Sequence, residues 1–245
     1  RRNTIAMRAS YEPISWLRVS SSVNIATSKA DVPGSFQGTS VIDGILEFPR
    51  DLSLVDRKDL SSPFNTPEAW YTPYGITNPY WAIENNYNHN DSKQVQGKIQ
   101  ADIKPIRQLT LTYRYGFDYT DYDFKIGFPQ ITLDDALINE DYGYAPSNMN
   151  QDGWVFSRYL RKYEKNHDFL ANWADKYLDG MLDVNVTAGV NMNERYQTLS
   201  SGQTDKLTFN TGFWDLSNGS TISELSESQS KRRLVGLFGD ITLGW

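Results

Sequence analysis

The sequence predicts an all-β fold, an antiparallel transmembrane β-barrel segment of about seven strands with long extracellular loops. Seven stretches alternate apolar and polar residues with the period of a β-strand. The connections between these stretches are alternately short and long. No stretch approaches the roughly 18 to 20 consecutive apolar residues that a membrane-spanning helix needs, so membrane crossing by helices is excluded.

Residues 3–11 and 16–26 form the first predicted hairpin, with Pro13 in the short turn between them. One side of each strand is apolar, and its residues are Ile5, Met7, Ala9, Tyr11, Leu17, Val19, Val23 and Ile25. The opposite side of the second strand carries small polar side chains. Such alternation predicts a strand with one face turned to a nonpolar environment.

Residues 95–105 and 108–119 form the second predicted hairpin. The apolar row of the second strand is rich in aromatic rings and consists of Leu109, Leu111, Tyr113, Tyr115, Phe117 and Tyr119. The third predicted hairpin pairs residues 166–177, where Leu170 and Asp175 break the alternation, with the more regular residues 182–195. Residues 234–245 form the last predicted strand.

The lengths of the connections distinguish a soluble sandwich from a membrane barrel. Three are of hairpin length (residues 12–15, 105–107 and 178–181), and three are long (residues 27–93, 120–165 and 196–233). A soluble domain rarely carries three loops of that length. A barrel with one rim of short turns and one of long loops requires this alternation, so we expect the apolar rows to face lipid.

Seven strands cannot close such a barrel, because an open edge in lipid would leave backbone groups unpaired. The chain also opens on Arg1 without an initiator Met and stops at Trp245 inside an alternating run. We therefore expect residues 1–245 to be an internal part of one barrel domain, with the remaining strands supplied from elsewhere.

The composition argues against several classes of function. The chain has no Cys and a net charge of -6, which disfavours thiol chemistry and a nucleic-acid partner. Its two histidines, His89 and His167, lie far apart without clustered ligands. Asp31 and Asp134–Asp135 are expected to be solvated surface residues. Asp121 and Asp123 share one face and form a weak candidate for a cation-binding site. We expect no catalytic residues, no metal site and no cofactor.

Two groups of residues are candidates for contact inside or above the barrel. Aromatic rings in the first long loop could stack on a ligand or merely pack the loop, and they are Trp70, Tyr71, Tyr74, Tyr80 and Trp81. The polar rows of the strands are expected to face the lumen, where they contact a plug or, less favoured, substrate. These residues are Lys98, Gln100, Asp102, Arg114, Asn185, Asn191 and Arg195.

Several segments, in this order, resemble the SusC/RagA family of TonB-dependent outer-membrane transporters of Bacteroidetes. They are "ASYEPISWLRVSSSVNIATS" (residues 9–28), "TNPYW" (Thr77 to Trp81), "ENNYNHND" (residues 84–91), "GKIQADIKPIRQLTLTYRYGFD" (residues 97–118) and "KRRLVGLFGDITLGW" (residues 231–245). The resemblance rests on the order of these segments along the chain.

The resemblance implies a 22-stranded barrel in the bacterial cell outer membrane, filled by a plug domain that this chain lacks. It also implies a SusD-like surface lipoprotein as partner, energy supplied through TonB, and import of oligosaccharides or peptides. The alternative is a secreted or surface-exposed β-sheet domain that binds glycans without transporting them. The two differ in what covers the apolar rows, which is lipid in the first case and protein in the second.

Overall fold

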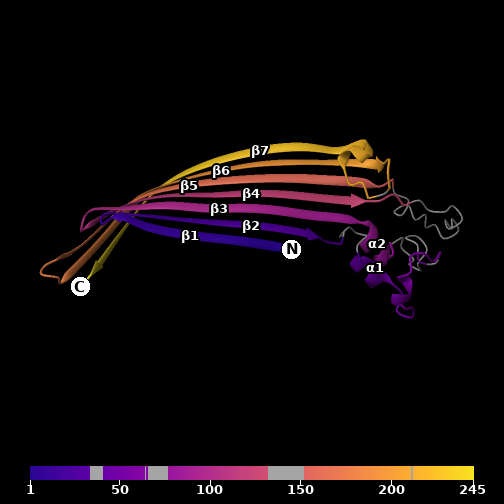
Figure 1. Ribbon diagram of the computed structural model, residues 1–245, viewed down its shortest axis with the longest axis horizontal. Helices are drawn as coiled ribbons and strands as arrows, with labels where there is room; N and C mark the ends of the chain where they lie inside the picture. Colours follow the sequence, from indigo (N-terminus) through magenta and orange to yellow (C-terminus); the bar gives the residue numbers. More distant parts are fainter. Residues whose placement is uncertain (34–40, 64, 66–76, 132–151, 211) are drawn as a thin grey trace.

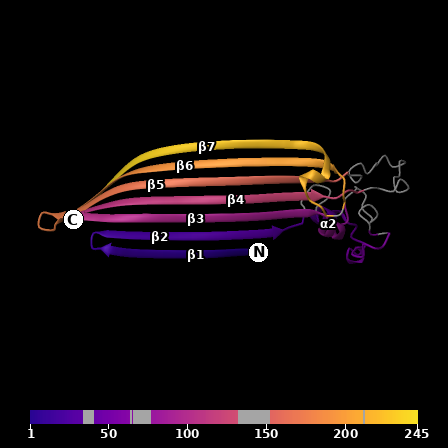
Figure 2. The same ribbon diagram turned by 45° about the horizontal axis from the view of Figure 1, so that its top comes forward.

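The computed structural model is a single antiparallel sheet in which each strand pairs with its neighbours along the chain (Figure 1). Its strands are β1 (Arg2–Ile14), β2 (Leu17–Asp31), β3 (Tyr87–Ile106), β4 (Leu109–Phe128), β5 (Trp154–Tyr177), β6 (Leu182–Leu207) and β7 (Gly219–Gly244). The structure describes residues 1–33, 41–63, 65, 77–131, 152–210 and 212–245. β1 and β7 are the edges of an open, curved sheet (Figure 2). The predicted all-β antiparallel barrel segment is confirmed.

Short helices lie at the end of the sheet opposite the short turns (Figure 1). They are α1 (Val41–Glu47), the 3-10 helix η1 (Val55–Arg57), α2 (Pro79–Asn85) and the 3-10 helix η4 (Leu216–Asn218). The alternating pattern of the sequence does not predict them. Within the described residues, no helix combines the length and apolar character needed to cross a membrane.

The strands are longer and the loops shorter than predicted. β3 to β7 contain 20 to 26 residues each, whereas the alternating stretches had 11 to 14. The prediction of a long third loop over residues 196–233 is wrong, because β6 continues to Leu207 and β7 begins at Gly219. The missed part of β6 is polar on both faces, so it lacks the contrast that marks a strand in a sequence.

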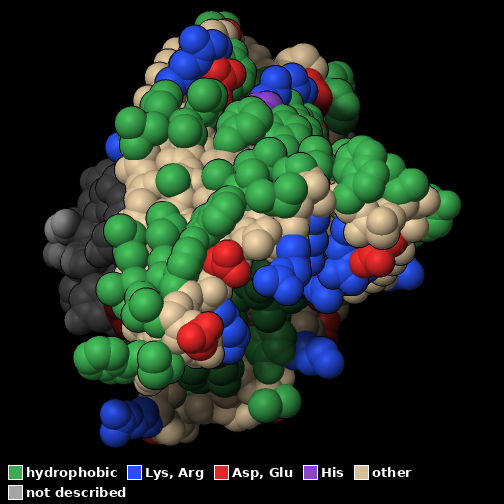
Figure 3. Space-filling view, turned by 90° about the vertical axis from the view of Figure 1, so that its left-hand side faces the viewer, with side chains coloured by type: hydrophobic (Ala, Val, Ile, Leu, Met, Phe, Trp, Pro, Cys, Tyr) green, Lys and Arg blue, Asp and Glu red, His purple; other side chains and the backbone are tan. Residues whose placement is uncertain are grey.

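The two faces of the sheet differ in chemistry near the short turns. We call one the Ile99 face, which carries the odd-numbered residues of β1–β5 and β7 and the even-numbered residues of β6. The other is the Gln100 face. Ile99, Met7 and Leu237 on the Ile99 face are 52%, 59% and 81% exposed. Hydrophobic side chains cover much of the end view of the molecule (Figure 3). Near the short turns, no second layer of the described chain covers the Ile99 face.

Candidate functional site

The Ile99 face carries an apolar band of nearly constant length. The band spans residues 95–105 in β3, 109–119 in β4 and 182–192 in β6, eleven residues in each strand. Eleven residues rise roughly 33 Å along a strand, and at a tilt of roughly 40° this gives a height of roughly 25 Å. That height matches the apolar belt of outer-membrane barrels.

The band runs obliquely across the hydrogen-bonded rows of the sheet. In one row, Gly97 and Phe117 of β3 and β4 continue into the charged residues Lys165, Glu194 and Arg233 of β5 to β7. The band therefore ends nearer the short turns in β5–β7. The short turns are shifted in the same direction as the band. The β5–β6 turn lies four residues further from the loops than the β3–β4 turn does. Strands tilted against a bilayer produce this offset.

Tyrosines mark the edge of the band away from the short turns. Tyr119, Tyr163 and Tyr196 are adjacent in register on β4, β5 and β6. The Lys165 ammonium lies 4.9 Å from the centre of the Tyr163 ring. Rings with one polar end favour the boundary between an apolar phase and water. A row of three tyrosines therefore crosses β4, β5 and β6 near the end of the apolar band that lies away from the short turns.

Charged side chains pair with one another on both sides of the tyrosine row, with Asp121 beyond Tyr119 and Glu194 on the short-turn side of Tyr196. Asp121 accepts a hydrogen bond from the Tyr159 hydroxyl at 2.5 Å and lies 3.5 Å from Arg161. Glu194 pairs with Lys231 at 3.4 Å and with Arg233. These pairs join β4 to β5 and β6 to β7. They place a hydrophilic surface directly next to the apolar band.

The polarity of the two faces is inverted beyond the band. On the Gln100 face, rings now pack together: the centres of Tyr122 and Phe124 lie 6.4 Å apart, and those of Phe124 and Phe156 lie 6.2 Å apart. Phe128 stacks on Trp154 at 6.2 Å and is almost fully buried. In this half of β4 the apolar side chains lie on the opposite face from the apolar band.

The Asn-Pro-Tyr-Trp segment fastens the first loop to this inner packing. Asn78 is fully buried, accepts a hydrogen bond from the Tyr80 backbone N–H at 3.1 Å and so caps α2. Its amide donates to the carbonyl oxygens of Arg57 at 3.1 Å and Asn65 at 2.8 Å. One side chain therefore ties three parts of the loop together.

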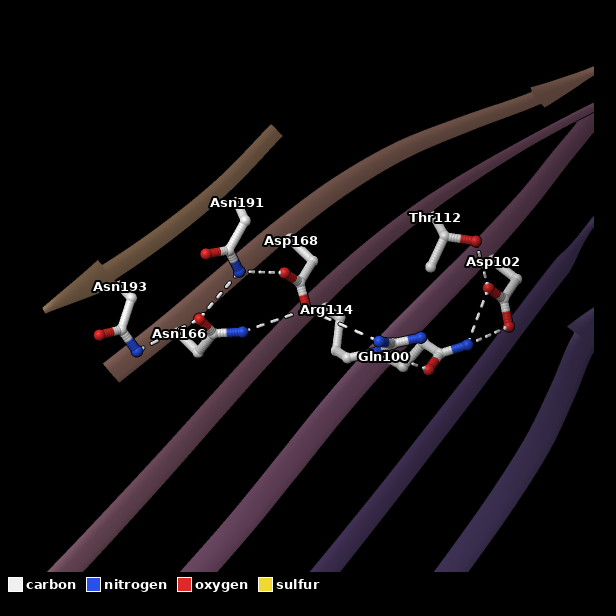
Figure 4. A network of polar contacts seen from close by, with 8 residues as sticks. All are labelled: Gln100, Asp102, Thr112, Arg114, Asn166, Asp168, Asn191 and Asn193. Carbon is white, nitrogen blue, oxygen red and sulfur yellow. Dashed lines mark hydrogen bonds and ion pairs between the residues drawn. The ribbon is translucent and has the colours of Figure 1, made fainter. Parts of the chain in front are cut away.

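A network of polar side chains crosses the Gln100 face from β3 to β6 (Figure 4). At one end, Asp102 accepts hydrogen bonds from Gln100 at 3.0 Å and Thr112 at 2.7 Å. Arg114 continues the network, since its Nε donates to Gln100 Oε1 at 3.2 Å and its Nη1 lies 3.6 Å from Asp168.

The β5 and β6 half of the network is centred on Asp168. Asp168 accepts from Asn191 at 2.5 Å and from Asn166 at 3.2 Å. Asn193 donates to Glu164 at 2.6 Å, and Glu164 pairs with Arg195 at 3.0 Å. Each carboxylate in this chain of contacts has a donor within the sheet, so much of this face satisfies its own polar groups.

All seven residues predicted to face the lumen or plug lie on the Gln100 face. Gln100, Asp102, Arg114 and Asn191 belong to the network, while Asn185 accepts a hydrogen bond from Asn172 at 2.7 Å. Lys98 has neither a hydrogen bond nor a salt bridge to another described residue. That these residues face a lumen or a plug remains a proposal.

The predicted ligand-binding aromatics are only partly within the described residues. Trp70, Tyr71 and Tyr74 lie outside them. Tyr80 and Trp81 are half-buried in α2, and the Trp81 ring meets the edge of Phe128 at 6.5 Å. Trp81 thus packs the loop onto the sheet, which was one of the two interpretations of these residues. Contact with a ligand remains a prediction.

Those candidate acid, base and metal residues that the structure describes do not assemble into a site. His89 Nδ1 lies 2.5 Å from Asp31 Oδ1, and His167 Nδ1 lies 2.9 Å from the Tyr113 hydroxyl oxygen. These histidines lie opposite Lys125 and Tyr115, ten positions apart on β4. Across the described ranges, no three His, Cys, Asp or Glu side chains are grouped to hold a metal. Asp134 and Asp135 lie outside those ranges.

The sequence analysis missed two features of the sheet and its loops. Asn166 and Asp168 belong to the network, and they could have been found because they alternate with His167 and Phe169. Trp214, in the loop between β6 and β7, stacks on Tyr87 at 5.8 Å. No periodic pattern surrounds Trp214, so the sequence carries no signal for that contact.

No family model matches the chain, and no curated protein matches it. Among solved structures it is similar to the RagAB peptide transporter, with a TM-score of 0.72 and 18% sequence identity over 100% of this chain and 26% of that chain. The chain is similar in fold to part of the RagAB barrel. The RagAB peptide importer gives TM-scores of 0.71 in its "open-open" and "closed-closed" states, at 18% and 17% identity.

The chain spans about a quarter of the length of the transporter chains that it matches. At this identity the likeness establishes the fold alone. It confirms, at the level of fold, the resemblance to the SusC/RagA family stated from the sequence. The matched chains are transporters rather than enzymes.

Proposed function

We propose that this chain is part of the barrel of a TonB-dependent importer in the bacterial outer membrane, with no enzymatic role. Its partner would be a SusD-like surface lipoprotein, and its cargo peptides or oligosaccharides. Peptides are the first candidate, because the similar RagAB structures are of a peptide transporter. Residues Lys98, Gln100, Asp102, Arg114, Asn185, Asn191 and Arg195 would face the interior.

One observation carries this proposal: the apolar band on the Ile99 face is one bilayer high, and the polarity of the faces inverts beyond it. In β4, the apolar residues run from Leu109 to Tyr119 on the Ile99 face and from Tyr122 to Phe128 on the Gln100 face. A soluble glycan-binding sheet keeps one apolar face along its length, because water surrounds it throughout.

Deletion of the gene for the complete polypeptide tests the transport function. In the wild type we expect the polypeptide in the outer-membrane fraction and copurification of a surface lipoprotein. In the deletion strain we expect loss of growth on peptides but not on free amino acids. Loss of growth on an oligosaccharide instead would identify oligosaccharides as the cargo. Recovery of the protein from the soluble fraction as a folded monomer would contradict the proposal and favour the glycan-binding alternative.

A further inference from the structure

A hollow of about 600 Å³ lies on the Gln100 face of β1, β2 and β3. Its side chains on this face are Arg8, Ser10, Ser20, Ser22 and Lys98. Arg8 lies opposite Ser22 and Ser22 opposite Lys98, so the two basic residues flank a small hydroxyl in one row. They are two strand spacings apart, roughly 10 Å.

The basic residues of the hollow differ from those of the neighbouring network. Arg114 and Arg195 on the same face pair with Asp168 and Glu164. Arg8 and Lys98 form no salt bridge with any carboxylate of the described residues, and both are exposed. The nearest carboxylate by register, Asp118, lies diagonally from Lys98 and accepts from Gln94 and Gln96. No carboxylate of the described residues therefore compensates the positive charge in the hollow.

The dimensions of the hollow indicate the class of ligand. A volume of about 600 Å³ lies within the range of ligand pockets, and it exceeds what a single small anion needs. The side chains of Arg8 and Lys98 are long enough to converge above Ser22, where both can donate to one carboxylate. Ser10 and Ser20 add hydroxyl groups beside that position.

We propose that this hollow binds the carboxylates of acidic peptides and gives the importer a preference for them. The inference rests on the proposed function and deepens it by naming the cargo. Binding by two cations is selective because an amide in place of the carboxylate can still accept hydrogen bonds but loses the attraction between opposite charges in both of them.

The test compares two synthetic peptides that differ only by Asp and Glu against Asn and Gln. Binding is measured by calorimetry on the complete polypeptide in detergent. We expect the acidic peptide to bind about tenfold more tightly, and Arg8→Gln with Lys98→Gln to bring both peptides to equal affinity. Lys98→Arg should keep the preference, and Lys231→Gln, on the other face, should not change it. Unchanged binding of the neutral peptide shows that the variants are folded.

Three results would overturn the inference. Equal affinity of the wild type for both peptides would leave the importer intact but remove the preference. Binding of neither peptide would count against peptide import itself. Carbodiimide coupling of the Lys98 amine to an acidic residue of the same polypeptide, with no peptide present, would mean that the hollow is filled by the protein's own chain.

Discussion

At the scale of single residues, Asn78 illustrates why a motif in a loop can be structural. Its Oδ1 caps α2, and its amide donates to two backbone carbonyl oxygens of the same loop. Burial excludes water from these groups, so each would lack a partner if the amide were lost. The sequence identified the Asn-Pro-Tyr-Trp segment but could not reveal its partners, since Arg57 and Asn65 are 21 and 13 residues away.

Asn78→Ala and Asn78→Asp separate the two roles of this side chain. Aspartate keeps the cap but loses both donors, so we expect each variant to destabilise the loop by about 1–3 kcal/mol. Limited proteolysis of the complete polypeptide should show faster cleavage in residues 41–86 for both. Asn85→Ala, which removes one bond to the Trp81 carbonyl oxygen, is the milder control. Wild-type cleavage of Asn78→Asp would mean that only the cap matters.

Gly127 is required by a close approach of Trp214. A Cβ at position 127 would lie 2.0 Å from Cε3 of the Trp214 ring, so the ring must move. We expect Gly127→Ala to break the stacking on Tyr87 at a cost of about 0.5–1.5 kcal/mol. The indole N–H resonance of Trp214, assigned with Trp214→Phe, should shift. Gly116→Ala, whose added Cβ meets its nearest neighbour at 3.9 Å, should leave that resonance in place.

At the scale of elements, the sequence predicts the strands only where the faces differ. The alternation from Leu109 to Tyr119 placed β4 correctly, because lipid on one side and polar groups on the other give a strong contrast. The phase of the alternation changes between Tyr119 and Tyr122, which ended the predicted strand although the backbone continues to Phe128. In β6, residues 196–207 have no contrast at all, so only tertiary pairing with β5 and β7 defines them.

The loop around η4 should be sensitive to acid. The backbone N–H and then the hydroxyl of Ser217, at 2.9 and 2.7 Å, lower the pKa of Asp215 below its ordinary value of 3.8. A lowered pKa contributes stability above the unfolded value, and this is lost as pH falls through the folded value. We expect exchange of the Ser217 amide to accelerate below about pH 3.8. Asp215→Asn should remove this step, and its persistence there would point to another group.

At the scale of the whole molecule, the open sheet leaves its apolar band outside any protein core. Its largest apolar surface is exposed, and the few buried apolar residues, such as Phe128 and Val155, lie near the loops. The apolar band of the Ile99 face therefore supplies no protein core, and its side chains need another apolar phase. The sequence predicted this from the order of short and long connections, although the third long connection is in fact mostly strand.

The position of that apolar phase can be tested along one face of one strand. Ala188 lies in the middle of the apolar band on β6, and Thr198 lies on the same face beyond its edge. Arginine at the centre of a bilayer costs about 2–4 kcal/mol in a barrel, and about 0–1 kcal/mol near the interface. We expect Ala188→Arg to lower the unfolding free energy of the complete barrel in lipid vesicles by the first amount, and Thr198→Arg by no more than the second. Equal effects would mean that height along β6 does not determine the environment of the Ile99 face. Lipid would then not be what covers it, because only a bilayer makes the cost of a charge depend on depth.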